Sequence, residues 1–318
     1  MDVDRKREDL HKILLEQVKK NKKSQMTIAV IGPPGVGKSS FINTMIASIT
    51  GEYRQWAKTG RGEGAITLRA IPVFQKKYME FADENLQQCV FPDILDIVGF
   101  EDSDDQVTRK AIELLFYGRI PSNVLVHEFL NKMRTSGTWP VEKMYPLTAE
   151  CKKIDRVIFV ASAANSNLPL ELCNAVRAVI SKKRDIPIFG VLTGRDKRSP
   201  ALENFEKFEE RFKSALGISN LNYLHCTSYC DDNINKIRVV EAKNYPDLDI
   251  PVLEFLKQVL DPALESTDII RPGRFTWIWF LEILYTTPAK FKGISASHWV
   301  LVAIVIALLV VILAILLK

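Results

Sequence analysis

A glycine-rich segment of eight residues constrains the fold of this chain more than any other feature. In order, the residues are Gly32, Pro33, Pro34, Gly35, Val36, Gly37, Lys38 and Ser39. The apolar run MTIAVI before it predicts a β-strand, and the periodicity of residues 39–49 predicts a helix. The pattern G-x-x-x-x-G-K-[ST] between strand and helix is typical of a loop whose backbone N–H groups surround phosphates. The sequence therefore predicts polyphosphate binding at this turn.

The residue types of this loop indicate separate roles. Glycines let the backbone turn its N–H groups inward, and the N-terminus of the following helix adds the positive end of a dipole. Lys38 is expected to reach the β- and γ-phosphates and to contribute to catalysis, and the Ser39 hydroxyl is expected to ligate Mg²⁺. Ser40, the next residue along the helix, belongs to the same candidate phosphate-binding set.

Short β-rich runs alternate with helical segments along most of the chain. After MTIAVIG the runs are ITLRAIPVF, VFPDILDIVG, DRVIFVASA, IPIFGVLTG and LNYLHCTS. Helical periodicity fills residues 106–117, 168–183, 201–216 and 252–260. This alternation predicts an α/β domain over residues 26–262, with a mostly parallel sheet and helices on both faces.

An aspartate at the end of a predicted strand gives a second candidate site. Asp96 begins the sequence Asp-Ile-Val-Gly that ends at Gly99. The carboxylate of Asp96 can hold Mg²⁺ directly or through water, and the backbone N–H of Gly99 can contact a γ-phosphate. Between the phosphate loop and the second predicted strand, Thr59 and Thr67 are both available to sense the γ-phosphate. We choose Thr67, which directly precedes the strand LRAIPVF, as a Mg²⁺ ligand and catalytic residue.

A third motif concerns the base of the nucleotide. The predicted strand IPIFGVL leads into Thr-Gly-Arg-Asp, at the place where GTPases carry [NT]-K-x-D. The carboxylate of Asp196 can accept hydrogen bonds from the ring N–H and the exocyclic amine of guanine, a pair that adenine does not offer. Gly194 stands where a lysine usually packs over the base, a contact that Arg195 could partly replace. The remaining candidate base-binding residues are Thr193, Thr227 and Ser228.

The residue that follows Gly99 bears on hydrolysis. It is Phe100, at the position where Ras-like enzymes place a glutamine that orients the attacking water. A phenyl ring cannot position water, so hydrolysis needs a group from the acidic stretch 101–105, from the partner in a homodimer or from an activating protein. We expect GTP or GDP with Mg²⁺ as ligands and slow intrinsic GTPase activity. A GTP-binding membrane scaffold with little hydrolysis and an adenine-specific P-loop ATPase are the alternatives.

The motifs together indicate a family. GPPGVGKSSFIN, DIVG and TGRD, with the insert FEDSDDQVTRKAIELLFYGRIPSN, resemble the interferon-induced protein 44 family of GTPase-like proteins. The resemblance covers residues 27–260 and implies a P-loop GTPase-like fold of the TRAFAC type, Mg²⁺-GTP as the ligand and a role in immune defence. The chain departs from the family at Gly194 and in its apolar C-terminal tail. Tail anchors occur in the immunity-associated GTPases.

The N-terminus predicts an appendage to this domain. Residues 1–25 predict an amphipathic helix whose apolar stripe consists of Leu10, Ile13, Leu14 and Val18. We expect this helix to dock on the main domain. A dimer contact and a contact with a lipid surface are the alternatives.

The C-terminus predicts a membrane anchor. From Trp299 to Leu317 the sequence contains no charge, and at 1.5 Å per residue it spans about 30 Å of hydrocarbon. Residues 298–318 therefore predict a transmembrane helix that anchors the chain in a lipid bilayer by its tail. Residues 263–297 predict an aromatic and basic segment beside the membrane. The domain is expected on the cytosolic side, with the endoplasmic reticulum favoured and the mitochondrial outer membrane as the alternative.

Composition argues against two classes of partner. The formal net charge is only +5 and the basic residues are spread along the chain, so nucleic acid is not expected. The five cysteines lack a regular spacing, which favours free thiols over a disulfide framework or a zinc site. The sequence thus predicts a guanine nucleotide, a bilayer, and a homodimer or an activating protein as partners.

Overall fold

A computed structural model of the chain describes the greater part of its N-terminal 268 residues. The described residues are 3–20, 26–51, 53, 56–57, 68–71, 89, 91–97, 99–120, 124, 126–148, 151–229 and 245–268. Among them, every helix is too short or too polar to span a bilayer. The predicted transmembrane helix and most of the predicted membrane-adjacent segment lie outside the described residues.

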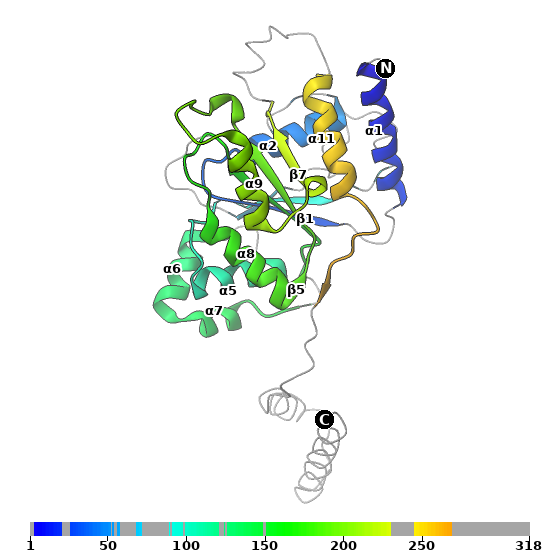
Figure 1. Ribbon diagram of the computed structural model, residues 1–318. Coiled ribbons are helices and arrows are strands. Elements are labelled where there is room, and N and C mark those ends of the chain that lie inside the picture. Colours follow the sequence, from blue (N-terminus) through cyan, green and yellow to red (C-terminus); the bar gives the residue numbers. More distant parts are fainter. Residues whose placement is uncertain are drawn as a thin grey trace, which may run out of the picture. The chain divides into compact units, whose positions relative to one another are not determined.

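A six-stranded sheet forms the centre of the fold (Figure 1), in the order β2-β3-β1-β4-β6-β7. Its strands are β1 (Thr27–Ile31), β2 (Leu68–Ile71), β3 (Asp93–Ile97), β4 (Arg156–Ser162), β6 (Ile188–Thr193) and β7 (Tyr223–Cys226). Neighbouring strands run parallel except β2, which pairs antiparallel with β3. All six predicted strands are therefore confirmed, and the mostly parallel sheet with them.

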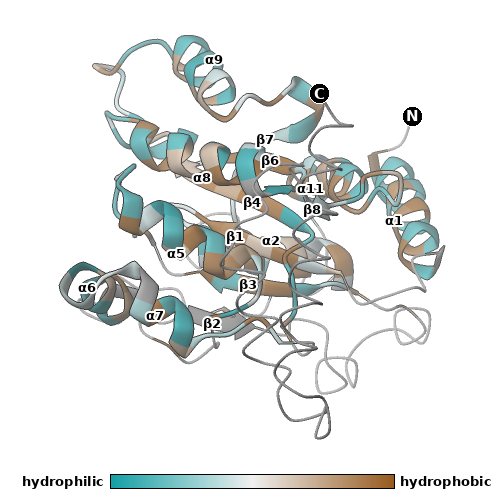
Figure 2. Cartoon of the chain, turned by 90° about the horizontal axis from the view of Figure 1, so that it is seen from below, coloured by the Kyte–Doolittle hydropathy of each residue, from teal (hydrophilic) through white to brown (hydrophobic). Residues whose placement is uncertain are grey.

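Both faces of the sheet are covered, and β1 shows how, because its apolar side chains point to alternate faces. In β1, Ala29 and Ile31 pack into one buried cluster, and Ile28 and Val30 pack into another. The first cluster includes side chains of α5 (Gln106–Phe116), α8 (Leu170–Lys183) and α9 (Phe205–Leu216). The second includes α2 (Lys38–Thr50) and α11 (Pro246–Val259). Figure 2 shows the apolar strands between these two layers of helices.

Two helix boundaries differ from the predictions for local reasons. The helix expected from residue 201 begins at Phe205, because the side chain of Asn204 accepts a hydrogen bond from the Glu206 N–H and caps it there. The helix expected from residue 252 begins earlier, with Pro246 in its first turn, where a missing N–H costs nothing. Pro251 lies inside this helix, so periodicity alone suggested a later start.

Several elements were not predicted. After α5 the chain forms α6 (Val126–Ser136) and α7 (Thr138–Met144). Glu142 of α7 accepts a hydrogen bond from Arg119 at 3.0 Å and forms an ion pair with Lys110 of α5 at 2.8 Å, which fixes α7 against α5. The other unpredicted elements are β5 (Arg184–Asp185) paired antiparallel with β8 (Thr267–Asp268), and the short 3-10 helices η1 (Arg195–Lys197) and η2 (Asn220–Asn222).

The N-terminal helix α1 (Val3–Lys20) packs beside α11, as Figure 1 shows, so the predicted docking on the main domain is confirmed. The predicted apolar stripe is wrong at Ile13, which is 40% exposed, whereas Leu15 is buried. The buried face also carries a charge: Arg7 donates a hydrogen bond to Asp249 of α11 at 2.6 Å. A buried arginine that pairs with a distant carboxylate leaves no signal in hydrophobic periodicity.

Candidate functional site

The glycine-rich turn leaves β1 at its carboxyl end and leads into α2, which begins at Lys38. The side chain of Lys38 is buried inside this turn, where its Nζ donates to the carbonyl oxygens of Gly32 at 3.0 Å and Pro33 at 2.6 Å. Burial lowers the pKa of Lys38 to about 8, although the nearby carboxylate of Asp96 opposes the shift. Among the described residues, the Lys38 ammonium thus contacts two neutral carbonyl oxygens and has one carboxylate, Asp96, nearby. An anion bound in the loop would stabilise the charged form.

The two residues predicted to bind Mg²⁺ lie side by side. The Ser39 hydroxyl, in the first turn of α2, donates to Oδ2 of Asp96 at 2.7 Å. Asp96 lies on β3, whose carboxyl end adjoins that of β1 because the two strands are parallel. A hydroxyl and a carboxylate oxygen are ligands that Mg²⁺ prefers, so the pair fits this ion. Thr59 and Thr67 lie outside the described residues.

The backbone after β3 packs directly under the glycine-rich turn. A Cβ atom on Gly99 would overlap the backbone nitrogen of Pro34, so only glycine allows this close approach. The next side chain, Phe100, is 2% exposed and belongs to the core on the α5 side of the sheet. Its ring is fixed among apolar side chains and cannot orient a water molecule.

Most of the acidic stretch after Phe100 has structural roles. Asp102 accepts a hydrogen bond from the Leu172 N–H in the first turn of α8 at 2.8 Å. Asp105 caps α5. The third carboxylate, Asp104, forms two hydrogen bonds of 2.6 Å with Arg109. Glu101 is exposed and is the residue of this stretch to which the structure gives no such role.

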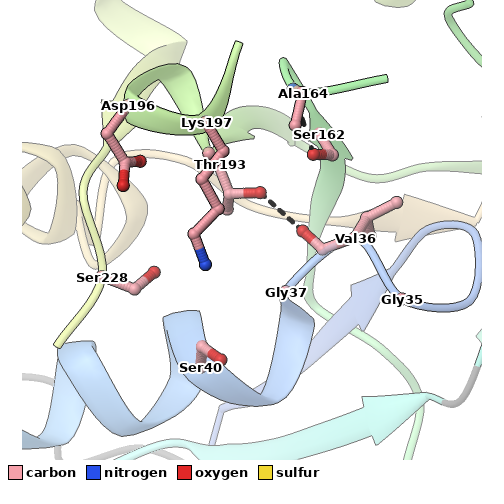
Figure 3. Close-up of a pocket in the computed structure, with 11 residues that line it drawn as sticks. Gly35, Val36, Gly37, Ser40, Ser162, Ala164, Thr193, Asp196, Lys197 and Ser228 are labelled. Atoms are coloured by element: carbon pink, nitrogen blue, oxygen red, sulfur yellow. Dashed lines mark hydrogen bonds between the residues drawn. The ribbon is translucent and has the colours of Figure 1, made fainter. Parts of the chain in front are cut away.

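The carboxyl end of β6 adjoins the other side of the glycine-rich turn. The hydroxyl of Thr193 donates to the carbonyl oxygen of Val36 at 2.5 Å, which ties the base motif to the phosphate loop. A pocket opens between these segments (Figure 3). It is lined by Gly35, Val36, Gly37, Ser40, Ser162, Ala164, Thr193, Gly194, Asp196, Lys197 and Ser228.

The pocket brings together some of the predicted base-binding residues and not others. Asp196 and Ser228 lie on its wall, as does Gly194, which packs beside Ser162 and Ala164. Arg195 does not line it, because its guanidinium lies 4.4 Å from the centre of the Phe205 ring. Thr227 is not among the lining residues either.

Three lining residues were missed by the sequence analysis. Ser162 ends β4 and Ala164 follows it. Because β4 lies between β1 and β6 in the sheet, its carboxyl end had to border the same pocket. Lys197 directly follows Asp196 and could have been considered from its position alone. Of the three, Lys197 has the longest side chain and the only charge, so it can contact a ligand farther into the pocket than Ser162 or Ala164.

Contacts far from the pocket support its base-facing loop. After Ser228, the backbone N–H of Tyr229 donates to the Thr44 hydroxyl on α2 at 2.9 Å. The Tyr229 hydroxyl donates to Asp249 on α11 at 2.9 Å, and Asp249 also accepts the hydrogen bond from Arg7 on α1. Asp249 is fully buried. The position of Ser228 therefore depends on α2 and also on α11 and α1, which contribute no lining residue to the pocket.

These features define the class of the protein. A mostly parallel sheet with one antiparallel edge strand, a lysine-containing turn after β1 and a serine–aspartate pair beside it constitute an α/β fold of the P-loop type. Ligands of open α/β sheets bind beyond the carboxyl ends of the strands, where this pocket lies.

Comparison with solved structures found matches that include three nucleotide-bound proteins. Toc33 from Arabidopsis thaliana with Mg²⁺ and GMPPNP is 14% identical, with 83% of this chain and 95% of that chain covered and a TM-score of 0.43. The GDP-bound ADP-ribosylation-factor-like Sar1 from Encephalitozoon cuniculi is 13% identical, with 80% and 88% covered and a TM-score of 0.35. Era from Aquifex aeolicus with GDP and AlF4⁻ is 14% identical, with 66% and 55% covered and a TM-score of 0.31.

Comparison by sequence adds no family. No protein-family model matches the chain, and no curated protein matches it. The resemblance to the interferon-induced protein 44 family therefore stays a prediction.

Proposed function

We propose that this chain is a membrane-anchored guanine-nucleotide-binding protein with slow GTPase activity. The observation that carries the proposal is the shared turn: it encloses Lys38, places Ser39 against Asp96, and opens toward a pocket that contains Asp196. One surface thus offers a cation for phosphates, oxygen ligands for a metal and a carboxylate for a base.

At the phosphate end, Lys38 and the backbone N–H groups of the turn would bind the polyphosphate. Ser39 and Asp96 would hold Mg²⁺, with Thr67 proposed as a third ligand. The bound ion would neutralise charge on the phosphate oxygens. The Ser39 hydroxyl donates a hydrogen bond to Asp96, and a bound ion would compete for both oxygens of this pair.

At the base end, Asp196 would select guanine. Its carboxylate is exposed and can accept two N–H donors of guanine, whereas adenine presents an acceptor at the ring position and would leave the carboxylate with an unfavourable contact. Competition of unlabelled GTP and ATP for bound fluorescent GTP tests this selectivity. GTP should compete at least tenfold better than ATP, since one mispaired charged contact costs about 1.5 kcal/mol or more. Equal competition would favour the ATPase alternative.

Slow hydrolysis follows from the surroundings of Gly99. Phe100 is buried, and three of the four carboxylates in residues 101–105 bind the start of a helix or form an ion pair, which leaves Glu101 as the acid of this stretch without such a role. A second copy of the chain or an activating protein would then supply the missing group. Single-turnover hydrolysis measured over a range of protein concentrations tests this. A rate that rises with concentration supports self-assembly, and fast turnover at all concentrations contradicts the proposal.

A second candidate function is a scaffold that binds GTP with little hydrolysis and recruits partners to a membrane. The buried position of Phe100 favours it, since no rotation of that side chain brings a polar group to the γ-phosphate. Absence of hydrolysis at every protein concentration, with GTP binding intact, would establish the scaffold.

Membrane attachment through residues 298–318 is part of the proposal and rests on the uncharged run from Trp299 to Leu317. We propose the endoplasmic reticulum as the site, with the mitochondrial outer membrane as the alternative, and an immune-type role. Fractionation of cells that express the full chain and a chain ending at residue 297 tests the anchor. The full chain should be found with membranes and the shorter chain should not.

A further inference from the structure

Lys197 enters the base end of the pocket. It is the last residue of η1, and its side chain is exposed and lines the pocket with Asp196. Figure 3 shows this side chain extending from η1 into the space between Ser228 and the first turn of α2, with its nitrogen at the far end. Among the lining residues of the described chain, Lys197 has the longest apolar stem and the only cationic group.

The backbone explains why a lysine is not found at position 194. Gly194 has φ +68°, a left-handed conformation that L-residues with a side chain adopt at a cost. A Cβ atom there would also lie 3.3 Å from the Ser162 hydroxyl and 3.6 Å from the Ala164 Cβ. The turn that delivers Asp196 to the pocket is thus built around glycine.

Arg195 does not provide the missing contact over the base either. Its guanidinium lies over the Phe205 ring, at the start of α9, at 4.4 Å from the ring centre. That contact directs Arg195 away from the pocket and favours keeping it there. Of the three residues of η1, Asp196 and Lys197 face the pocket and Arg195 faces α9.

We propose that Lys197 covers one face of the guanine ring, in place of a lysine at position 194, where the left-handed backbone disfavours a side chain. This inference rests on the proposed function. The four-carbon stem of the Lys197 side chain would cover apolar surface of the guanine ring while Asp196 binds the edge of the ring. Figure 3 places the ammonium group at the end of the stem, beyond Asp196 and near the first turn of α2, so the stem is the part of Lys197 beside the proposed base position.

The test compares two ligands and three variants of the full-length protein by calorimetry. GDP contains the base, and inorganic pyrophosphate contains only the phosphates. Lys197→Ala removes stem and charge, Lys197→Met keeps most of the stem, and Lys207→Ala changes an exposed lysine on α9 outside the pocket.

We expect Lys197→Ala to weaken GDP binding about tenfold, as for two methylene groups that lose their buried contact, and to change pyrophosphate binding less than twofold. Lys197→Met should bind GDP within about threefold of the unmodified chain, and Lys207→Ala should match it. Equal loss of GDP and pyrophosphate affinity would overturn the proposal, because the ammonium would then contact phosphate. A Lys197→Met variant as weak as Lys197→Ala would overturn it for the same reason.

Failure of the inference differs from failure of the proposed function. If the unmodified chain binds pyrophosphate and GDP, and Lys197→Ala leaves both unchanged, only the role of Lys197 is refuted. If the unmodified chain binds neither ligand, the proposed function is refuted and the role of Lys197 with it. Circular dichroism of each variant confirms that these exposed substitutions leave the fold intact.

Discussion

The two ends of the pocket are built in different ways. The phosphate end consists of one continuous segment, residues 32–40, and one aspartate from the neighbouring strand. The base end combines the segment after β6, the segment after β4 and Ser228, and is supported through Tyr229 by α2, α11 and α1. Local sequence therefore determines the first end, whereas the second depends on how distant elements pack.

The largest expected effect lies at the phosphate end. Lys38→Ala should weaken GDP binding about a thousandfold, because charge-assisted hydrogen bonds to two phosphate groups, worth about 4 kcal/mol together, are lost. Calorimetry with GDP and with pyrophosphate measures the change. Both ligands should be affected alike, in contrast to the Lys197 variants. A loss confined to GDP would contradict the assignment of Lys38 to phosphate.

Next in size is the support of the base end from α1. Arg7→Met should lower the free energy of unfolding by about 3 kcal/mol, because it leaves the fully buried carboxylate of Asp249 without its cation. Urea denaturation measures this. Lys6→Ala is the matched control: its ion pair with Glu254 is exposed and should contribute less than about 1 kcal/mol.

The same Arg7→Met variant sharpens the comparison of the two ends. Under conditions where the Arg7→Met variant is folded, it should bind GDP more weakly than the unmodified chain does. Its affinity for pyrophosphate should stay within about twofold of that of the unmodified chain, because the loop that carries Ser228 is the part that loses support. An equal loss of affinity for GDP and for pyrophosphate would show that α1 supports the whole site.

A smaller effect is expected at the base contact. Asp196→Asn should weaken GDP binding about thirtyfold, or about 2 kcal/mol, because one acceptor for the guanine N–H pair is lost with its charge. ADP binding should not weaken. A parallel loss of GDP and ADP affinity would mean that Asp196 supports the pocket without reading the base.

The smallest effect is expected away from both ends. Burial alone would raise the pKa of Glu142, but hydrogen bonds from Lys110 and Arg119 outweigh it and lower this pKa. The charged form of Glu142 therefore stabilises the fold at any pH above the ordinary carboxyl pKa. This stabilisation is lost as the pH falls through the lowered pKa of the folded state.

Glu142→Gln should therefore cost about 1 kcal/mol of unfolding free energy at pH 7, and the difference from the unmodified chain should shrink below about pH 4.5. GDP binding should be unchanged, since α7 is not part of the pocket. Urea denaturation at pH 7 and pH 4 measures both values. A cost independent of pH would show that the substitution acts through packing.

The sequence was informative wherever short-range patterns determine structure. Apolar runs predicted all six strands of the sheet, and the spacing of Gly32 and Gly37 before Lys38 and Ser39 predicted the turn. Register and direction were not readable: the antiparallel course of β2 depends on pairing with β3 across the fold.

Contacts between distant residues account for what was missed. Ile13 and Leu15 are equally apolar, and only the position of α11 decides which of them is buried. Likewise, the left-handed backbone of Gly194 turns Arg195 toward Phe205 and leaves Lys197 at the pocket, a result of turn geometry that residue types alone did not reveal.

The most direct test is a calorimetric titration of the full-length chain, kept in detergent, with GTP and Mg²⁺, beside the Lys38→Ala variant. The account predicts saturable binding at one site per chain that Lys38→Ala abolishes at the same concentrations. Absence of binding by the unmodified chain, or equal binding by both proteins, would contradict it.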